Sequence, residues 1–213
     1  MNLSFSKLIP SPFLDTDYSV SQVWGRDFTL QGSTSVLVSA ASGKGKTTLV
    51  NIIIGQRNDY VGTMLIDGKS PLDMNARELS ILLSRKISTV HQGLMLFDEL
   101  DTWQNIALKN RITNFKTDSE IDEMLNQLGL AAFKKQKIKR LSYGQKQRVA
   151  IIRALCQPFG FILLDEPFSH LDSENASKAW DLIVSEAKLQ QAGIVMTSLG
   201  GDHKISFDQI LQL

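Results

Sequence analysis

Strand-like segments alternate with segments of helical periodicity along most of the chain. Strand patterns occur at 36–38, 87–90, 161–164 and 193–197. The run Phe161-Ile-Leu-Leu164 has no polar position, which is typical of a strand that is buried on both faces of a parallel sheet. Because strands and helices alternate, we predict an α/β fold in which helices cover both faces of a mainly parallel sheet.

Several helices are marked by start signals as well as by periodicity. Asn75 and Glu78 have the spacing of a capping box, and so do Thr117 and Glu120. The second pair opens a helix whose apolar residues recur on one face, namely Ile121, Met124, Leu125 and Leu128. We expect that face to pack inside the protein rather than to bind a partner. The N-terminal region is less regular, and only residues 28–30 indicate a strand.

A glycine-containing loop joins the strand at 36–38 to a helical run at 49–54. A strand, a loop ending in Gly-Lys-Thr and a helix form the phosphate-binding loop of P-loop NTPases. Small residues let backbone N–H groups close around phosphates, and the helix N-terminus adds a favourable dipole. We expect Lys46 to contact the phosphates and the Thr47 hydroxyl to ligate Mg²⁺. The nucleotide-binding residues expected in this loop are Ala40, Ala41, Ser42, Gly43, Lys44, Gly45, Lys46, Thr47 and Thr48.

Ala40 stands where the usual loop pattern begins with glycine. Because alanine is also small, we expect a modest constraint on the turn rather than loss of the site. An ordinary loop rich in glycine and serine is the alternative interpretation, and the flanking strand and helix patterns argue against it.

Two adjacent carboxylates, Asp165 and Glu166, follow the buried strand at 161–164. Ligands of open α/β sheets bind at the carboxyl ends of the strands, where the phosphate-binding loop is also expected. Asp165 is therefore placed to hold Mg²⁺, directly or through water, and Glu166 to orient or deprotonate an attacking water. A pair of solvated acids in a turn is the alternative.

A third motif is Leu141-Ser-Tyr-Gly-Gln145, which leads into a long helical segment. Its backbone donors, its hydroxyl and the helix N-terminus can all serve a phosphate. Together with the phosphate-binding loop and the paired carboxylates, this motif resembles the signature of ATP-binding cassette (ABC) ATPases. The resemblance covers nearly the whole chain from about Phe28 onward, with the motifs in the family's order.

The resemblance implies one ABC ATPase domain over residues 1–213, with an N-terminal β subdomain. Its P-loop core is expected at about 1–92 and 151–213, and an inserted helical subdomain at about 93–150. Two such cassettes would pair head to tail around ATP, held between the phosphate-binding loop of one and the signature turn of the other. The signature residues implied by the resemblance are Ser142, Tyr143, Gly144 and Gln145.

Two further segments match family motifs. Gln92 corresponds to the glutamine of the Q-loop, which in the family contacts Mg²⁺ and couples to a membrane partner. Residues 169–172, Ser-His-Leu-Asp, correspond to the D-loop that follows the paired carboxylates.

Two positions depart from the family pattern. Tyr143 replaces the first glycine of the signature, and we expect this to be tolerated because the rest of the motif is intact. Ser198 stands where the family has a switch histidine, and serine reaches less far and carries no charge. Losing one donor to transition-state charge costs about 10²–10³ in rate, so hydrolysis is expected to be slow, or a partner to supply the missing group. His203, five residues later, is an alternative source of an imidazole.

The other histidines and the N-terminal aromatics carry weaker signals. His91 and His170 lack metal-ligand spacing and are expected to be structural or exposed. In many ATPases of the family an aromatic ring upstream of the phosphate-binding loop stacks on adenine. Tyr18 lies at about the right distance, with Phe13 and Trp24 as alternatives.

Composition excludes several classes of protein. With 23 basic and 22 acidic residues the net charge is +1, so bulk charge does not drive binding to nucleic acid or to an anionic membrane. The single cysteine, Cys156, favours a reducing compartment. No secretory signal occurs, and no run approaches the ~18 apolar residues of a membrane span. We therefore expect a cytoplasmic protein that reaches the inner face of the membrane through a permease.

The sequence thus predicts a Mg²⁺-dependent ATPase subunit of an ABC transporter. Its expected catalytic residues are Glu166 and Ser198, and its expected metal ligands are Thr47, Gln92 and Asp165. The expected partners are a second cassette, homo- or heteromeric, and an integral membrane permease, without direct nucleic-acid binding. One alternative is a regulatory cassette that binds ATP with little turnover. Another is a non-transport ABC ATPase that acts on DNA or ribosomes.

Overall fold

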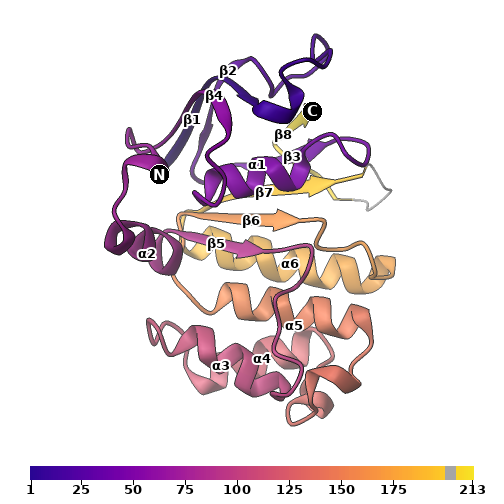
Figure 1. Cartoon of the computed structure of the whole chain (residues 1–213). Coiled ribbons are helices and arrows are strands. Elements are labelled where there is room, and N and C mark those ends of the chain that lie inside the picture. Colours follow the sequence, from indigo (N-terminus) through magenta and orange to yellow (C-terminus); the bar gives the residue numbers. More distant parts are fainter. Residues whose placement is uncertain (200–204) are drawn as a thin grey trace.

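The computed structural model describes residues 1–199 and 205–213, which form two β-sheets and six α-helices (Figure 1). All strand pairs in the larger sheet are parallel. Its strands follow the order β5 (Ile87–Val90), β6 (Phe161–Asp165), β7 (Gly193–Ser198), β3 (Ser35–Ser39) and β8 (Gln209–Gln212). The predicted α/β fold with a mainly parallel sheet is therefore confirmed.

The helices lie on both sides of this sheet. Figure 1 shows α1 between the two sheets and α5 and α6 on the opposite face, with α3 and α4 beyond them. Their bounds are α1 (Lys46–Ile53), α2 (Ala76–Arg85), α3 (Thr102–Asn110), α4 (Asp118–Gln127), α5 (Tyr143–Leu155) and α6 (Ser173–Leu189). Short 3₁₀ helices occur at η1 (Ser11–Phe13), η2 (Pro71–Asp73), η3 (Ala131–Phe133) and η4 (Ile138–Arg140).

The strand β6 is buried along its whole length, as its apolar run predicts. Its residues alternate between two hydrophobic clusters because successive side chains of a strand point to opposite faces. Ile162 and Leu164 belong to the cluster of α3 to α6, whereas Phe161 and Leu163 belong to the cluster around α1 and the smaller sheet. The strand therefore ends at Asp165 in a rigid position.

The smaller sheet is antiparallel and consists of β2 (Asp27–Gln31), β1 (Asn2–Pro10) and β4 (Tyr60–Ile66). It contains the strand expected at residues 28–30, but β1 has no counterpart in the sequence prediction. Its register against β4 shifts between Ser6 and Ile9, which breaks the alternation that would mark a strand. The rings of Phe5 and Phe28 stack at a centroid distance of 4.5 Å and join β1 to β2.

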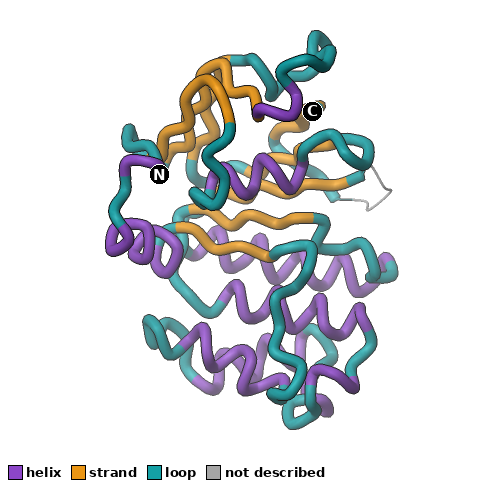
Figure 2. The backbone as a smooth tube through the Cα atoms, in the orientation of Figure 1, coloured by secondary structure: helices purple, strands orange, loops and turns teal. Residues whose placement is uncertain are grey.

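The local start signals located two helices correctly (Figure 2). Asn75 and Thr117 are the N-caps of α2 and α4, and each forms the complete capping box. The four apolar residues of the α4 face are buried, so this face packs inside the protein as expected. The last strand, β8, begins at Gln209, and residues 205–208 precede it without regular structure. The helix α5 runs through residue 150, where the sequence suggested a subdomain boundary.

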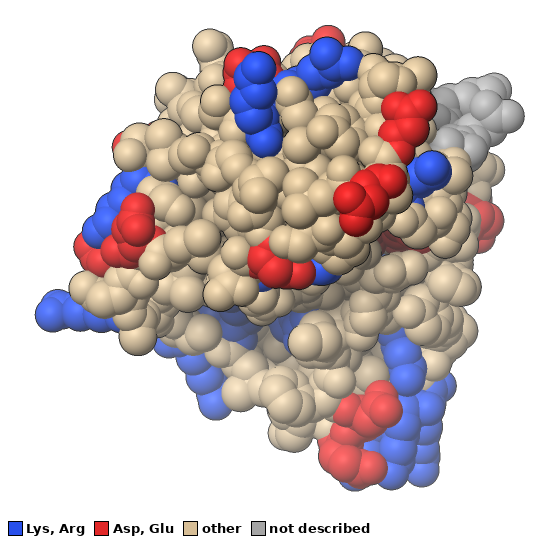
Figure 3. Space-filling model, turned by 45° about the horizontal axis from the view of Figure 1, so that its top comes forward, with Lys and Arg blue, Asp and Glu red and all other residues tan. Residues whose placement is uncertain are grey.

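Charged residues of both signs are interspersed on the face shown in Figure 3. Cys156 is fully buried, and burial raises the pKa of its thiol to about 12, which makes it a small core residue. Within residues 1–199 and 205–213, none of the helices is both long and apolar enough to cross a membrane.

Candidate functional site

The loop after β3 has the backbone form of a phosphate cradle. Gly45 is the N-cap of α1 and adopts a left-handed conformation with φ +98°. A Cβ at Gly45 would lie 2.7 Å from the ring of Phe13 and 3.0 Å from that of Trp24, so only glycine fits there. Gly43 also has positive φ, but a Cβ there would meet no atom within 4 Å, so the loop is open at this point. Ala40, at the start of the loop, is buried.

Lys46 is almost completely buried although it carries a charge. Its Nζ donates to the carbonyl oxygens of Ala40 at 2.9 Å and Ala41 at 3.1 Å, and lies 3.3 Å from Oε1 of Glu166. A buried ammonium needs such partners because desolvation of an unpaired charge is costly. The ammonium is therefore held inside the loop, where a phosphate would compete with these carbonyls.

Asp165 lies at the end of β6, is 2% exposed, and accepts a hydrogen bond at each carboxylate oxygen. Its Oδ2 accepts from the hydroxyl of Thr47 and its Oδ1 from that of Thr197, each at 2.7 Å. Thr197 also accepts from the backbone N–H of Glu166 at 3.2 Å. The sequence analysis missed Thr197; its signal was a hydroxyl at the end of a strand beside the carboxylates.

Glu166 adopts the left-handed region with φ +50°, which is unusual for a residue other than glycine. Strained backbone of this kind concentrates at functional sites. The turn directs its carboxylate toward the loop, where Oε1 faces Lys46 and Oε2 accepts from Nε2 of Gln92 at 3.4 Å. The structure thus brings the predicted Lys46, Gln92 and Glu166 together in one site.

The signature turn begins α5 and lies beside the Q-loop. Ser142 is the N-cap and forms a capping box with Gln145. The hydroxyl of Tyr143 donates to the carbonyl of Gln92 at 3.2 Å, so the tyrosine joins the two motifs. A Cβ on Gly144 would lie 2.8 Å from the carbonyl oxygen of His170, which explains why this position is glycine.

The remaining predicted positions lie around this site. Ser198 ends β7, and its carbonyl accepts from the backbone N–H of Ala40 at 3.2 Å. Thr48 follows Thr47 on α1 and accepts from the guanidinium of Arg57 at 3.4 Å. His203 lies outside the described residues.

Two aromatic residues contact the phosphate-binding loop directly. The indole N–H of Trp24 donates to the carbonyl of Lys44 at 3.3 Å, and its ring stacks with Phe13 at a centroid distance of 6.1 Å. Trp24 is buried and Phe13 is half-buried. Tyr18 instead packs on Gly25, where a Cβ would lie 2.9 Å from its ring.

The donor set suits a magnesium nucleotide. Thr47 and Asp165 offer a hydroxyl and a carboxylate, which are the hard oxygen ligands that Mg²⁺ prefers, alongside waters and phosphates. No group of three or more His, Cys, Asp or Glu side chains that could hold a metal occurs in the part of the chain that the structure describes. Mg²⁺ in nucleotide sites is commonly held by one or two protein ligands together with phosphates and waters.

Comparisons with known proteins agree with this geometry. Residues 25–169 match the ABC transporter family. The lipoprotein-releasing system ATP-binding protein LolD 2 of Chlorobaculum tepidum is 30% identical over 220 residues, which cover 99% of this chain and 89% of that protein. The dimeric structure of the bacterial ABC transporter cassette MJ0796 has a TM-score of 0.84 at 24% identity and covers 99% of this chain and 94% of its own.

A second dimeric structure of that cassette, in a post-hydrolysis state bound to ADP and Pi, has a TM-score of 0.78 at 25% identity over 93% of this chain and 88% of its own. The fold is therefore that of an ABC cassette with a P-loop core. The chain belongs to the ABC transporter family, as one of its ATP-binding subunits.

Proposed function

We propose that this chain hydrolyses MgATP in a dimer of cassettes and couples hydrolysis to a membrane permease at the inner face of the membrane. Two contacts at the carboxyl edge of the parallel sheet support this proposal most directly. Lys46 pairs with Glu166, and Thr47 donates to Asp165. These groups combine a phosphate-binding cation, an oxygen pair for Mg²⁺ and a carboxylate for water.

In the proposed mechanism Lys46 exchanges its carbonyl partners for phosphate oxygens. Thr47, Asp165 and Gln92 would hold Mg²⁺, which when bound would neutralise negative charge on the phosphates. Glu166 orients a water and accepts its proton. The water oxygen forms a bond to the γ-phosphorus as the bond to the bridging oxygen breaks, leaving ADP and phosphate.

We propose that two cassettes pair head to tail, so that Ser142 and Gly144 of one chain serve the ATP of the other. We also propose that Ser198 stabilises the transition state less than a histidine would, because serine is shorter and uncharged, so that turnover is slow unless a partner supplies a donor. Turnover per chain should then rise with protein concentration as dimers form. The measurement is phosphate release at saturating MgATP over a wide concentration range; constant specific activity would contradict dimeric catalysis.

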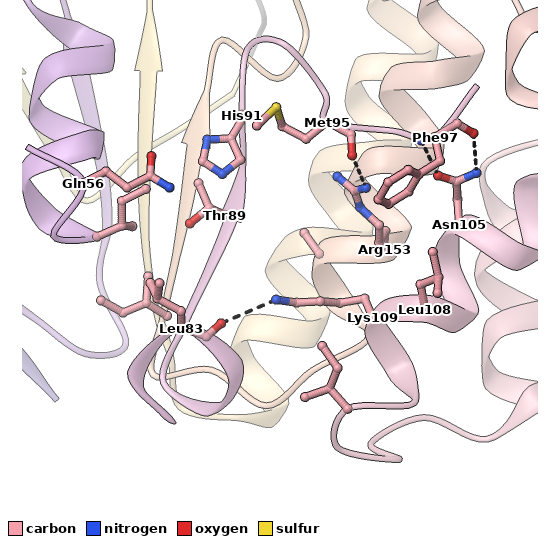
Figure 4. Close-up of a pocket in the computed structure, with 14 residues that line it drawn as sticks. Gln56, Leu83, Thr89, His91, Met95, Phe97, Asn105, Leu108, Lys109 and Arg153 are labelled. Carbon is pink, nitrogen blue, oxygen red and sulfur yellow. Dashed lines mark hydrogen bonds between the residues drawn. The ribbon is translucent and has the colours of Figure 1, made fainter. Parts of the chain in front are cut away.

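A groove between the core and the helical region offers a surface for the permease. It has a volume of about 340 Å³, and His91, which precedes Gln92 in the sequence, lies on its wall (Figure 4). Its rim carries large apolar side chains that are about half exposed, namely Met95, Phe97, Leu108 and Ile112. Such exposed apolar residues gathered in one place are typical of a partner surface.

The charges in the groove are all positive. Arg153 donates to the carbonyls of Leu94 and Met95 at 2.6 and 2.5 Å, and Lys109 donates to that of Leu83 at 3.4 Å. None of the 14 lining residues drawn in Figure 4 is acidic. Burial lowers the pKa of both cations, with repulsion from Arg153 adding to the effect on Lys109. We propose that the permease inserts an apolar helical segment with a carboxylate that pairs with these cations.

Phe97→Asp should abolish capture of the permease while leaving basal ATP hydrolysis unchanged. A carboxylate on the rim removes apolar contact area, and a carboxylate of the incoming segment would repel it. Leu189→Asp, which changes an exposed leucine at the end of α6, is the matched control and should retain capture. The measurement is affinity capture of a co-expressed permease from detergent-solubilised membranes. Equal capture by both variants would place the permease elsewhere.

A regulatory cassette with little turnover is the second candidate. Ser198 favours it, since serine reaches less far than histidine and carries no charge to stabilise the transition state. ATP-dependent dimerisation without phosphate release at any protein concentration would support this alternative.

A further inference from the structure

His170 is an exposed residue of the loop between β6 and α6, held by a buried amide. Gln147 is 1% exposed; its Oε1 accepts from the backbone N–H of His170 at 3.2 Å, and its Nε2 donates to Oγ of Ser169 at 3.0 Å. Because a backbone N–H can only donate, the amide oxygen of Gln147 must face His170, and its nitrogen therefore faces Ser169. The loop is thus anchored at two successive residues.

This anchoring orients the imidazole. Oγ of Ser169 lies 2.9 Å from Nδ1 of His170. Since the hydroxyl already accepts from Gln147, its own hydrogen is available for Nδ1, which favours the tautomer with the proton on Nε2. The ring therefore presents an N–H donor on the side away from its own loop.

His170 also packs against the signature turn. The centroids of the rings of Tyr143 and His170 are 4.2 Å apart, and the backbone of His170 occupies the space beside Gly144. The signature turn faces the ATP of the partner chain in the proposed head-to-tail dimer. In that dimer His170, packed on the turn, would lie at the same interface between the two chains.

We infer that His170 donates a hydrogen bond from Nε2 to the terminal phosphate of ATP bound on the partner chain. The step forms no covalent bond; the donor stabilises charge that develops on the phosphoryl oxygens. It replaces across the interface part of what Ser198 does not supply within its own chain. This inference rests on the proposed function, because it requires the head-to-tail dimer.

Chemical modification tests the location of His170. Diethyl pyrocarbonate should modify the exposed imidazole in the monomer, whereas MgATP-induced dimers of Glu166→Gln should protect it at least fivefold. The measurement is mass spectrometry of the modified peptide below and above the concentration of dimerisation, with dimers detected independently by sedimentation. Dimers in which His170 stays equally reactive would overturn the inference alone. Absence of dimers would overturn the proposed function and, with it, the inference.

The turnover of four variants, each compared with the wild type, tests the role of His170. His170→Ala should lower turnover of the dimer by about 10²-fold, as expected for one lost donor. His170→Gln, whose amide can still donate, should retain more activity. Ser198→His should raise the turnover of His170→Ala at least tenfold. It should raise the turnover of the wild type much less, because there His170 already donates to the terminal phosphate. A merely structural His170 would not produce this dependence between the two positions.

Glu174→Gln is the control: it alters an exposed side chain early in α6 that forms an ion pair with Lys178, and it should leave turnover unchanged. If His170→Ala is as active as this control, or if Ser198→His raises turnover equally in both backgrounds, the inference is wrong. If His170→Ala is inactive, yet Ser198→His fails to restore it in a folded dimer, the inference is also wrong.

Discussion

Glu166→Gln is expected to lower MgATP turnover by about 10²- to 10⁴-fold while ATP remains bound. General-base help contributes this much, and an amide can orient water but cannot accept its proton. Glu166 is placed for this role by its left-handed backbone and by the hydrogen bond from Gln92. The measurement is phosphate release at saturating MgATP, beside equilibrium binding of ATP.

The same substitution should tighten nucleotide binding. The carboxylate of Glu166 lies 3.3 Å from the ammonium of Lys46 and competes with phosphate for it. Removing the negative charge frees Lys46 for the nucleotide and reduces repulsion of the phosphates. Glu99→Gln neutralises an exposed acid paired with Lys137 and Lys139 and serves as the control. Turnover of Glu166→Gln equal to that of Glu99→Gln would show that Glu166 is not the base.

The elements predicted best are those whose signal is local. The apolar run of β6 and the capping boxes of α2 and α4 each depend on residues close together in sequence, and all three were located correctly. The strand β1 was missed because the irregularity after Ser6 interrupts its alternation. Its place in the sheet comes from pairing with β2 and β4, which no local pattern encodes.

In the candidate site, too, the residues predicted from sequence are those with a local motif, and contacts that form only on folding were missed. Motif spacing identified Lys46, Thr47 and Asp165, but not that Thr47 donates to a carboxylate 118 positions away. Thr197 and Gln147 gave no motif signal, since their importance comes from which groups they meet after folding. His170 was expected to be structural or exposed; its exposed ring packs on Tyr143 of α5 and contacts the hydroxyl of Ser169.

The segment between α3 and α4 is tied to α6 by a buried ion pair, Lys116–Glu186. The ammonium of Lys116 lies 3.0 Å from Oε1 and 2.9 Å from Oε2 of Glu186, and both side chains are less than a tenth exposed. Burial acts to lower the pKa of Lys116, but its hydrogen bonds and attraction to Glu186 and Glu120 prevail and the pKa is raised. A cation whose folded pKa is raised stabilises the fold below its unfolded pKa, and this contribution is lost only as pH rises through the folded value.

Lys116→Ala should therefore lower the free energy of unfolding by about 3–5 kcal/mol, because it leaves the carboxylate of Glu186 buried and unpaired. The loss should be constant between about pH 6 and 9, below the raised pKa of Lys116. The measurement is urea unfolding followed by circular dichroism.

Two comparisons separate burial from charge pairing as the cause of this loss. Lys178→Ala removes an exposed pair with Glu174 on one helix and should cost only about 0.3–0.5 kcal/mol. The double change Lys116→Met with Glu186→Leu should recover most of the stability, because replacing both charges leaves no buried charge without a partner. If Lys116→Ala costs no more than Lys178→Ala, the ion pair does not hold the segment between α3 and α4 against α6. If the double change is as unstable as the single one, the contact depends on the attraction itself rather than on avoiding an unpaired buried charge.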